Sequence, residues 1–137
     1  MNQNTTLPTR LRRVRQKGVG FLGPDGEPWT GAKPVCVDRS TKWGNPFVVG
    51  TDRVRDREHA TRMFAAVLCG NLPLDVGPDH ATLKAAYERM HADLHELMGH
   101  PLACWCPHPE PGRPDHCHAA VLIAHAARLA NTENELA

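Results

Sequence analysis

The 137 residues are enough for one domain with a substantial core and are few for two. Hydrophobic residues make up 41% and charged residues 23%, which is ordinary for a globular protein. No apolar run approaches the roughly 20 residues of a membrane span. The net charge of +1 conceals an asymmetry, because residues 1–50 carry eight Lys/Arg against three Asp/Glu, while residues 51–137 carry eight against twelve. The basic first part is compatible with phosphate contacts, or is simply a solvated charged strand and tail.

Cysteine usage and the first residues predict the compartment. Five cysteines, an odd number, argue against a disulfide framework and for reduced thiols. The first eight residues are polar and lack the apolar stretch of a secretory signal. We therefore expect a cytoplasmic protein without a membrane partner, in which residues 1–9 form a disordered arm.

The first elements expected along the chain are short strands. Residues 10–18 alternate imperfectly between apolar and charged side chains, which predicts an edge strand blunted by its charges. The sequence Gly-Pro-Asp-Gly at residues 23–26 predicts a turn. Residues 34–38 include the β-branched Val35 and Val37 and predict a short, partly buried strand. Residues 48–49 are compatible with a further strand segment before Gly50.

Two helices are expected next. Residues 56–70 carry apolar side chains at helical spacing, with Thr51 or Asp52 as candidate caps and Gly70 as a stop. Residues 79–98 carry an apolar stripe with charged side chains facing outward, which predicts a second helix.

The last part of the chain predicts a buried strand followed by a buried helix. Residues 102–106 are short and apolar, as is typical of the middle of a parallel sheet. A helix from Cys117 or His118 to Ala130 is apolar nearly all round, and a frayed tail over residues 132–137 follows it. Together these elements predict a single α/β domain over residues 10–131, with a short, mostly parallel sheet flanked by about three helices.

The sequence Lys-Trp-Gly-Asn-Pro-Phe at residues 42–47 predicts a shaped loop, because an Asn before Pro is excluded from the α region. An aromatic side chain beside positive charge and a hydroxyl suits a nucleobase or a phosphate-bearing ligand. The alternative is a structural turn whose Trp packs on the domain. The candidate ligand-binding residues are Arg39, Ser40, Lys42, Trp43 and Asn45.

A second candidate site lies at the junction of the last strand and the last helix. Strand alternation places Cys104 and Cys106 on one face, and Cys106 lies at the carboxyl end, where open α/β sheets have their ligand crevices. Cys117 and His118 lie at a helix N-terminus, whose dipole favours anions and lowers the pKa of a thiol. We expect the two loops to meet, with Cys117 as a reactive thiolate, His118 as acid/base or anion contact, and Cys106 beside them.

Two alternatives for this junction stay open. A zinc site could draw its ligands from Cys104, Cys106, His108, His116, Cys117 and His118. The ligand types suit zinc, but C-x-C followed by an adjacent Cys-His is not a standard zinc spacing. In the other alternative the thiols pack in the core as small hydrophobic side chains, and the histidine caps the helix or forms a local hydrogen bond.

The two motifs together, KWGNPF and CWC followed by Cys117-His118, resemble the domain of unknown function 4326 family of phage and bacterial proteins. The resemblance extends over roughly residues 14–131. It implies one α/β domain with these segments as signature positions, and it implies no particular reaction.

Two departures from the family pattern bear on function. Family members commonly carry an acidic residue two places after the histidine, where this chain has Ala120, so an activity that needs that carboxylate would be weakened or lost here. The loop over residues 107–116 is longer than usual and adds His108 and His116.

The function predicted from the sequence is binding or processing of a nucleotide or nucleic-acid component. Trp43 would stack on the ligand, Lys42 and Arg39 would contact phosphate, and Cys117 with His118 would perform any chemistry. The competing function is a non-enzymatic, zinc-supported binding module for nucleic acid or a protein partner.

Overall fold

Four strands form one mixed sheet in the computed structural model, which describes residues 9–136 of the chain. The strands are β1 (Arg10–Gln16), β2 (Val19–Leu22), β3 (Val35–Cys36) and β4 (Leu102–Cys104), in the order β2-β1-β4-β3. β4 pairs in parallel with both β1 and β3, and β2 pairs antiparallel with β1. The sheet is therefore mostly parallel, as expected. The predicted arm lies outside the described residues except for Thr9.

The position of β1 corrects the sequence-based expectation of an edge strand. A tight turn at Gly18, which has a φ of +76°, leads from β1 into β2, so β1 lies between β2 and β4. The short β2 was not expected, because its four residues include Gly20 and give too little alternation to detect. Arg10 and Arg13 are accommodated on this interior strand because their long side chains reach partners beyond it, namely Asp115 and Asp38.

Three α-helices and one 3₁₀ helix accompany the sheet in the described residues: α1 (Arg57–Leu68), α2 (His80–Asp93), η1 (Leu94–Leu97) and α3 (His118–Leu136). Asp56 caps α1 by accepting a hydrogen bond from the N–H of His59, so the cap is neither Thr51 nor Asp52. The helix expected over residues 79–98 divides into α2 and η1. α3 continues past Ala130, where its end was expected.

Residues 48–50 form a turn and not the strand segment considered for Val48 and Val49. Both side chains are exposed, at 45% and 43%, so no sheet partner covers them. Thr51 closes this turn, because its N–H and its hydroxyl both donate to the carbonyl of Val48. A β-turn over residues 48–51 therefore replaces strand pairing at this point.

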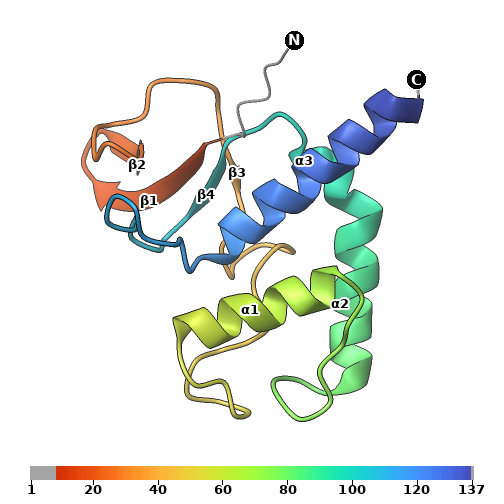
Figure 1. Ribbon diagram of the computed structural model, residues 1–137. Coiled ribbons are helices and arrows are strands. Elements are labelled where there is room, and N and C mark those ends of the chain that lie inside the picture. Colours follow the sequence, from red (N-terminus) through yellow and green to blue (C-terminus); the bar gives the residue numbers. More distant parts are fainter. Residues whose placement is uncertain (1–8, 137) are drawn as a thin grey trace.

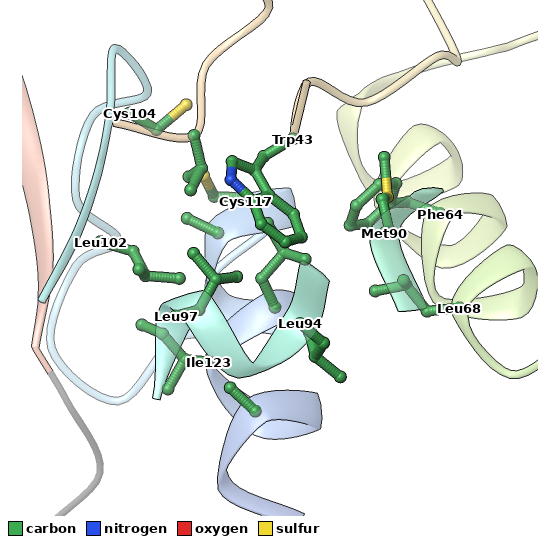
Figure 2. Packing of buried hydrophobic residues seen from close by; sticks show 14 of the residues in the cluster. Trp43, Phe64, Leu68, Met90, Leu94, Leu97, Leu102, Cys104, Cys117 and Ile123 are labelled. Atoms are coloured by element: carbon green, nitrogen blue, oxygen red, sulfur yellow. The ribbon is translucent and has the colours of Figure 1, made fainter. Parts of the chain in front are cut away.

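α3 lies between the sheet and the other helices (Figure 1). The main core fills the space between β4, α3 and η1 and includes Leu97, Leu102 and Leu122, all nearly fully buried (Figure 2). A smaller cluster around Phe47, Val67 and Leu83 joins α1, α2 and the loop after β3. This arrangement brings the end of β4, the start of α3 and the loop after β3 together. None of the helices in the described part of the chain is long and apolar enough to cross a membrane.

Candidate metal centre and adjoining pocket

The end of β4 carries two thiols whose sulfurs are in contact. The strand stops at Cys104, and Trp105 and Cys106 lie in a bend instead of continuing it. The bend still returns Cys106 to the side of Cys104, and the two Sγ atoms are 3.7 Å apart. The indole of Trp105 points elsewhere and is 37% exposed, with the guanidinium carbons of Arg13 and Arg15 lying 4.6 and 4.8 Å from its ring centroid.

Arg10 fixes the loop that follows these thiols. Its guanidinium donates to the carbonyl oxygens of Cys106 and Pro107, at 2.7 and 2.9 Å. The same group donates to both carboxylate oxygens of Asp115, at 2.8 and 2.7 Å. Arg10 is 7% exposed, and one buried cation therefore binds both ends of the loop over residues 107–116. This clamp determines where the chain enters α3.

α3 begins beside the same two sulfurs. The carbonyl of Cys117 accepts a hydrogen bond from the N–H of Ala120, and His118 is the first residue of the helix. Both side chains are buried, at 1% and 6% exposure. Nε2 of His118 lies against the carbonyl oxygen of Val37, and its ring makes an edge-to-face contact with Phe64 at 5.4 Å. Because a carbonyl can only accept, Nε2 carries the proton and Nδ1 keeps its lone pair.

Three thiols and one imidazole therefore converge at this junction. The ligand atoms of Cys104, Cys117 and His118 all lie within 4.8 Å of one another. Cys106 is in contact with the thiols of both Cys104 and Cys117. We call these four residues the Cys₃His cluster. Such a donor set, with a histidine whose other nitrogen donates to a backbone carbonyl, could hold a metal ion.

The thiols of the Cys₃His cluster differ in their acidity. Hydrogen bonds from Cys104 and Cys117, with help from the charge of Arg57, lower the pKa of Cys106. Hydrogen bonds to Cys104 and Cys106, together with burial, raise the pKa of Cys117. Burial lowers the pKa of His118 more than its bond to Val37 raises it, so the imidazole is neutral. Without a metal, Cys106 is therefore the most acidic of these thiols and Cys117 the least.

The two additional histidines of the zinc alternative lie outside the Cys₃His cluster. Nε2 of His108 is 3.0 Å from the carbonyl oxygen of Arg10. His116 accepts a hydrogen bond from Arg57 at its backbone carbonyl, and its side chain lines a neighbouring pocket. Among the described residues, neither histidine belongs to a group of three or more ligands.

Trp43, in the loop after β3, lies in the core and does not form the ligand-stacking surface expected from the sequence. Trp43 is only 3% exposed and belongs to the main core, where Figure 2 shows its indole beside Cys117. A buried indole has no free face, so the structure does not support Trp43 as a stacking platform for a ligand. Gly44 permits the close packing of this loop, because a Cβ atom there would lie 2.7 Å from the Cα of Arg39.

Lys42 and Ser40 are also engaged elsewhere. Lys42 Nζ forms ion pairs with Asp93 and Glu96, at 2.9 and 2.8 Å, and so faces α2 and η1. The hydroxyl and the backbone N–H of Ser40 both donate to the carboxylate of Asp38. Neither side chain lines the pocket beside the Cys₃His cluster.

Arg39 and Asn45, by contrast, do reach that pocket. Asn45 Nδ2 donates to the carbonyl of Ala60 at 3.1 Å, which ties the loop to α1. Arg39 donates to the carbonyl oxygens of Asn45 and Phe47. Both residues line a cavity of about 50 Å³ whose other walls include Cys106, Cys117 and His118. We call this cavity the thiol pocket.

Asp38 anchors the start of the loop, and its titration is open to test. Burial alone would raise the pKa of Asp38, but hydrogen bonds from Ser40 and Arg13 outweigh it and lower that pKa. The carboxylate therefore stabilises the fold above its unfolded pKa of about 3.9, and this stabilisation disappears as the pH falls through the lower folded value.

We expect Asp38→Asn to lower the free energy of unfolding by about 2 kcal/mol at pH 7, because three hydrogen bonds to a charged group are weakened. Urea unfolding at pH 7 and pH 3 measures this, and the difference from wild type shrinks at pH 3, because Asp38 is then largely protonated in the unfolded state. Asp75→Asn, at an exposed position, is the control. An equal loss at both pH values would contradict the assignment.

Residues that the sequence analysis missed complete the site. Arg57, the first residue of α1, lines the thiol pocket and donates to the carbonyl of His116 at 3.2 Å. In the sequence it is one of several charged residues near a helix start, and no periodicity distinguishes it. Arg10 and Asp115 were likewise overlooked, since they are 105 positions apart and no local pattern links them.

Comparison with protein-family models gives one match: residues 26–128 fit the model of a family described as Domain of unknown function (DUF4326). The match includes both signature segments, the Cys₃His cluster and all residues of the thiol pocket, and it begins after β2. The comparisons with curated proteins and with solved structures gave no match.

Proposed function

Since the chain belongs to the DUF4326 family, whose description names no activity, we propose a function from the site itself: a zinc-supported binding domain for a nucleotide or nucleic-acid component. Cys104, Cys106, Cys117 and His118 hold one Zn²⁺, and the centre supports the wall of the thiol pocket. The observation that carries this proposal is that the ligand atoms of Cys104, Cys117 and His118 lie within 4.8 Å of one another, with the Sγ of Cys106 3.7 Å from that of Cys104 as the fourth donor.

The sulfur geometry supports zinc. In a tetrahedral site, neighbouring ligands are separated by about 1.63 times the bond length, so Zn–S bonds of about 2.3 Å place sulfurs about 3.8 Å apart. The separation between the Sγ atoms of Cys104 and Cys106 is 3.7 Å. Carboxylate ligands, which would favour magnesium or calcium, are absent from the cluster.

The hydrogen bond of His118 supports the same metal. Histidines that bind zinc usually donate their second ring N–H to a carbonyl or a carboxylate, which fixes the tautomer and the ring orientation. The carbonyl of Val37 provides that acceptor, and Nδ1 is left with its lone pair. The lowered pKa of His118, caused by burial, keeps the ring neutral and competent as a ligand.

Four protein ligands fill a tetrahedral zinc and leave no position for a water or a substrate, as in structural zinc sites. Zinc here therefore supports binding and fixes the end of β4, the following loop and the start of α3 relative to one another. Its role in this proposal is to shape a binding surface, and the loss of the family's acidic residue at Ala120 does not affect that role.

A second candidate function is cysteine chemistry in a metal-free protein, and one observation favours it. Cys106 is partly exposed and lines the thiol pocket beside Arg57, whereas Cys117 is buried. In that function Cys106, rather than the predicted Cys117, is the nucleophile. The catalytic roles of Cys106, Cys117 and His118 remain predictions.

Metal analysis tests the zinc proposal and separates the two functions. We expect protein purified without chelators to contain about one zinc per chain by elemental analysis. Cys104→Ser reduces the zinc content, while Cys69→Ser, an exposed cysteine outside the Cys₃His cluster, leaves it unchanged. A metal-free, fully folded wild-type protein that takes up no added zinc would refute the proposal and leave the cysteine chemistry.

A further inference from the structure

The described residues that line the thiol pocket include two arginines and no aspartate or glutamate. Arg39 and Arg57, which carry permanent positive charge, line it together with His116. No aspartate or glutamate lines it in the described part of the chain. Asp56, which precedes Arg57, is occupied as the cap of α1, and Asp115 is bound by Arg10. The pocket therefore lacks the carboxylates that usually neutralise neighbouring arginines.

The arginines keep donors for a ligand. Arg39 uses Nη1 and Nη2 for two backbone carbonyls, and Arg57 uses Nη2 for one, whereas each guanidinium has five N–H groups. Both groups are thus held in place by bonds to the protein while some of their N–H groups remain unused in these bonds. Guanidinium groups fixed in this way suit the oxygens of a phosphate, which they can bind in a bidentate manner.

The charges around the pocket do not cancel. A zinc ion with three thiolates carries one net negative charge. The guanidinium groups of Arg39 and Arg57 contribute two positive charges, which leaves a surplus of one. A bound anion balances this surplus. α3 also begins at the pocket wall, at His118, where its dipole favours negative charge.

The dimensions of the pocket restrict the anion. About 50 Å³ is well below the roughly 300–1,000 Å³ of pockets that hold whole cofactors or drug-sized ligands. It is suited to a single compact oxyanion group. A second cavity of about 280 Å³ shares Arg57 and His116 with it and is otherwise walled by the loop over residues 107–116. The rest of a small ligand can lie in this second cavity.

We propose that the thiol pocket is a subsite for a terminal phosphate monoester, bound by Arg39 and Arg57, with the remainder of the ligand in the adjoining cavity. This inference rests on the proposed function, because it names the ligand group recognised beside the zinc centre. It identifies a small phosphorylated molecule of nucleoside monophosphate size, bound at its phosphate end. The phosphate, and not the base, supplies most of the recognition.

Calorimetric titration of the zinc-loaded full chain tests this proposal with three probes: adenosine monophosphate, adenosine and inorganic phosphate. We expect adenosine monophosphate to bind at least about tenfold more tightly than adenosine, since charge-assisted hydrogen bonds to the phosphate are lost in the nucleoside. Inorganic phosphate competes with adenosine monophosphate. If phosphate alone binds as tightly as the nucleotide, the site is one for free phosphate and the adjoining cavity holds no part of the ligand, which overturns the monoester assignment.

Arginine variants locate the subsite. Arg57→Gln is expected to weaken binding of adenosine monophosphate by more than about tenfold, and Arg39→Gln similarly. Arg62→Gln is the matched control, because Arg62 is exposed on the same helix as Arg57 and lines neither cavity. Arg57→Gln provides the sharper test, since Arg39 also holds the loop that ends at Phe47.

Zinc content, measured on every titrated sample, separates this inference from the proposed function. A wild-type protein that holds zinc but binds adenosine monophosphate no better than adenosine overturns the phosphate subsite and leaves the zinc domain intact. A metal-free protein that binds the nucleotide through Arg57 overturns the zinc proposal and retains the subsite. An Arg57→Gln variant with full zinc content and unchanged nucleotide affinity also overturns the subsite.

Discussion

If the Cys₃His cluster holds zinc as proposed, removal of the metal is expected to lower the melting temperature by at least about 15 °C. Structural zinc binds with roughly 10–16 kcal/mol in small domains, and a domain of this size is stable by only about 5–15 kcal/mol. Even a loss of about 5 kcal/mol corresponds to a shift of this size. The physical reason is that Cys104, Cys106 and Cys117 join the central strand to the helix that packs on it.

Thermal unfolding followed by circular dichroism, with and without a strong chelator, measures the effect. The double variant Cys36→Ser/Cys69→Ser serves as the control, because it keeps the Cys₃His cluster and therefore loses the same number of degrees on chelation. Cys106→Ser melts near the temperature of chelated wild type and gains nothing from added zinc. If elemental analysis confirms that the metal has been removed while the melting temperature stays within about 2 °C, the centre does not support the fold.

Replacing Arg10 by methionine is expected to cost about 3 kcal/mol of unfolding free energy. The change keeps the apolar stem but removes a buried cation with four hydrogen bonds. The carboxylate of Asp115 and the carbonyls of Cys106 and Pro107 then lack their partner. Breaking a buried ion pair on one side costs about 3–5 kcal/mol, and Asp115, at 21% side-chain exposure, places the loss at the lower end of that range.

Urea unfolding at pH 7 measures this loss, and a double-mutant cycle isolates the ion pair. Arg10→Met/Asp115→Ala is expected to be more stable than Arg10→Met alone, because no uncompensated charge remains. Lys17→Met, an exposed change just beyond the same strand, shifts the stability by less than about 0.5 kcal/mol. If both Arg10 variants are equally unstable, the arginine acts by packing and not through Asp115.

Local patterns predicted the parts of the fold that depend on local physics. The apolar run at β4 and the helical spacing of α1 and α2 each identified an element with its approximate limits. β1 was misplaced because its arginines resemble those of a solvent-facing edge, whereas Arg10 is satisfied by a residue 105 positions away. No single-sequence pattern reveals such a pairing.

In the candidate site, too, some features follow from local patterns in the sequence and others from tertiary contacts. Alternation along β4 placed Cys104 and Cys106 on one side, and the strand-to-helix junction placed Cys117 and His118 at a helix start. The contact between these four residues also depends on the loop between Cys106 and Cys117. Arg10 holds this loop through tertiary hydrogen bonds to both of its ends. The orientation of Trp43 was equally inaccessible, because a turn containing Gly44 and Asn45 can direct the indole outward or inward. Only the packing around Cys117 determines that it points inward.

The sheet order has a consequence for synthesis on the ribosome. β1 and β3 do not pair with each other, and both pair with β4, which is translated about 90 residues after β1 begins. A nascent chain can therefore form the β1–β2 hairpin early, but it has no partner for the other edge of β1 until Leu102–Cys104 emerges from the exit tunnel. Closing so long a loop slows folding. During translation that hairpin is the segment most exposed to pairing with other unfinished chains.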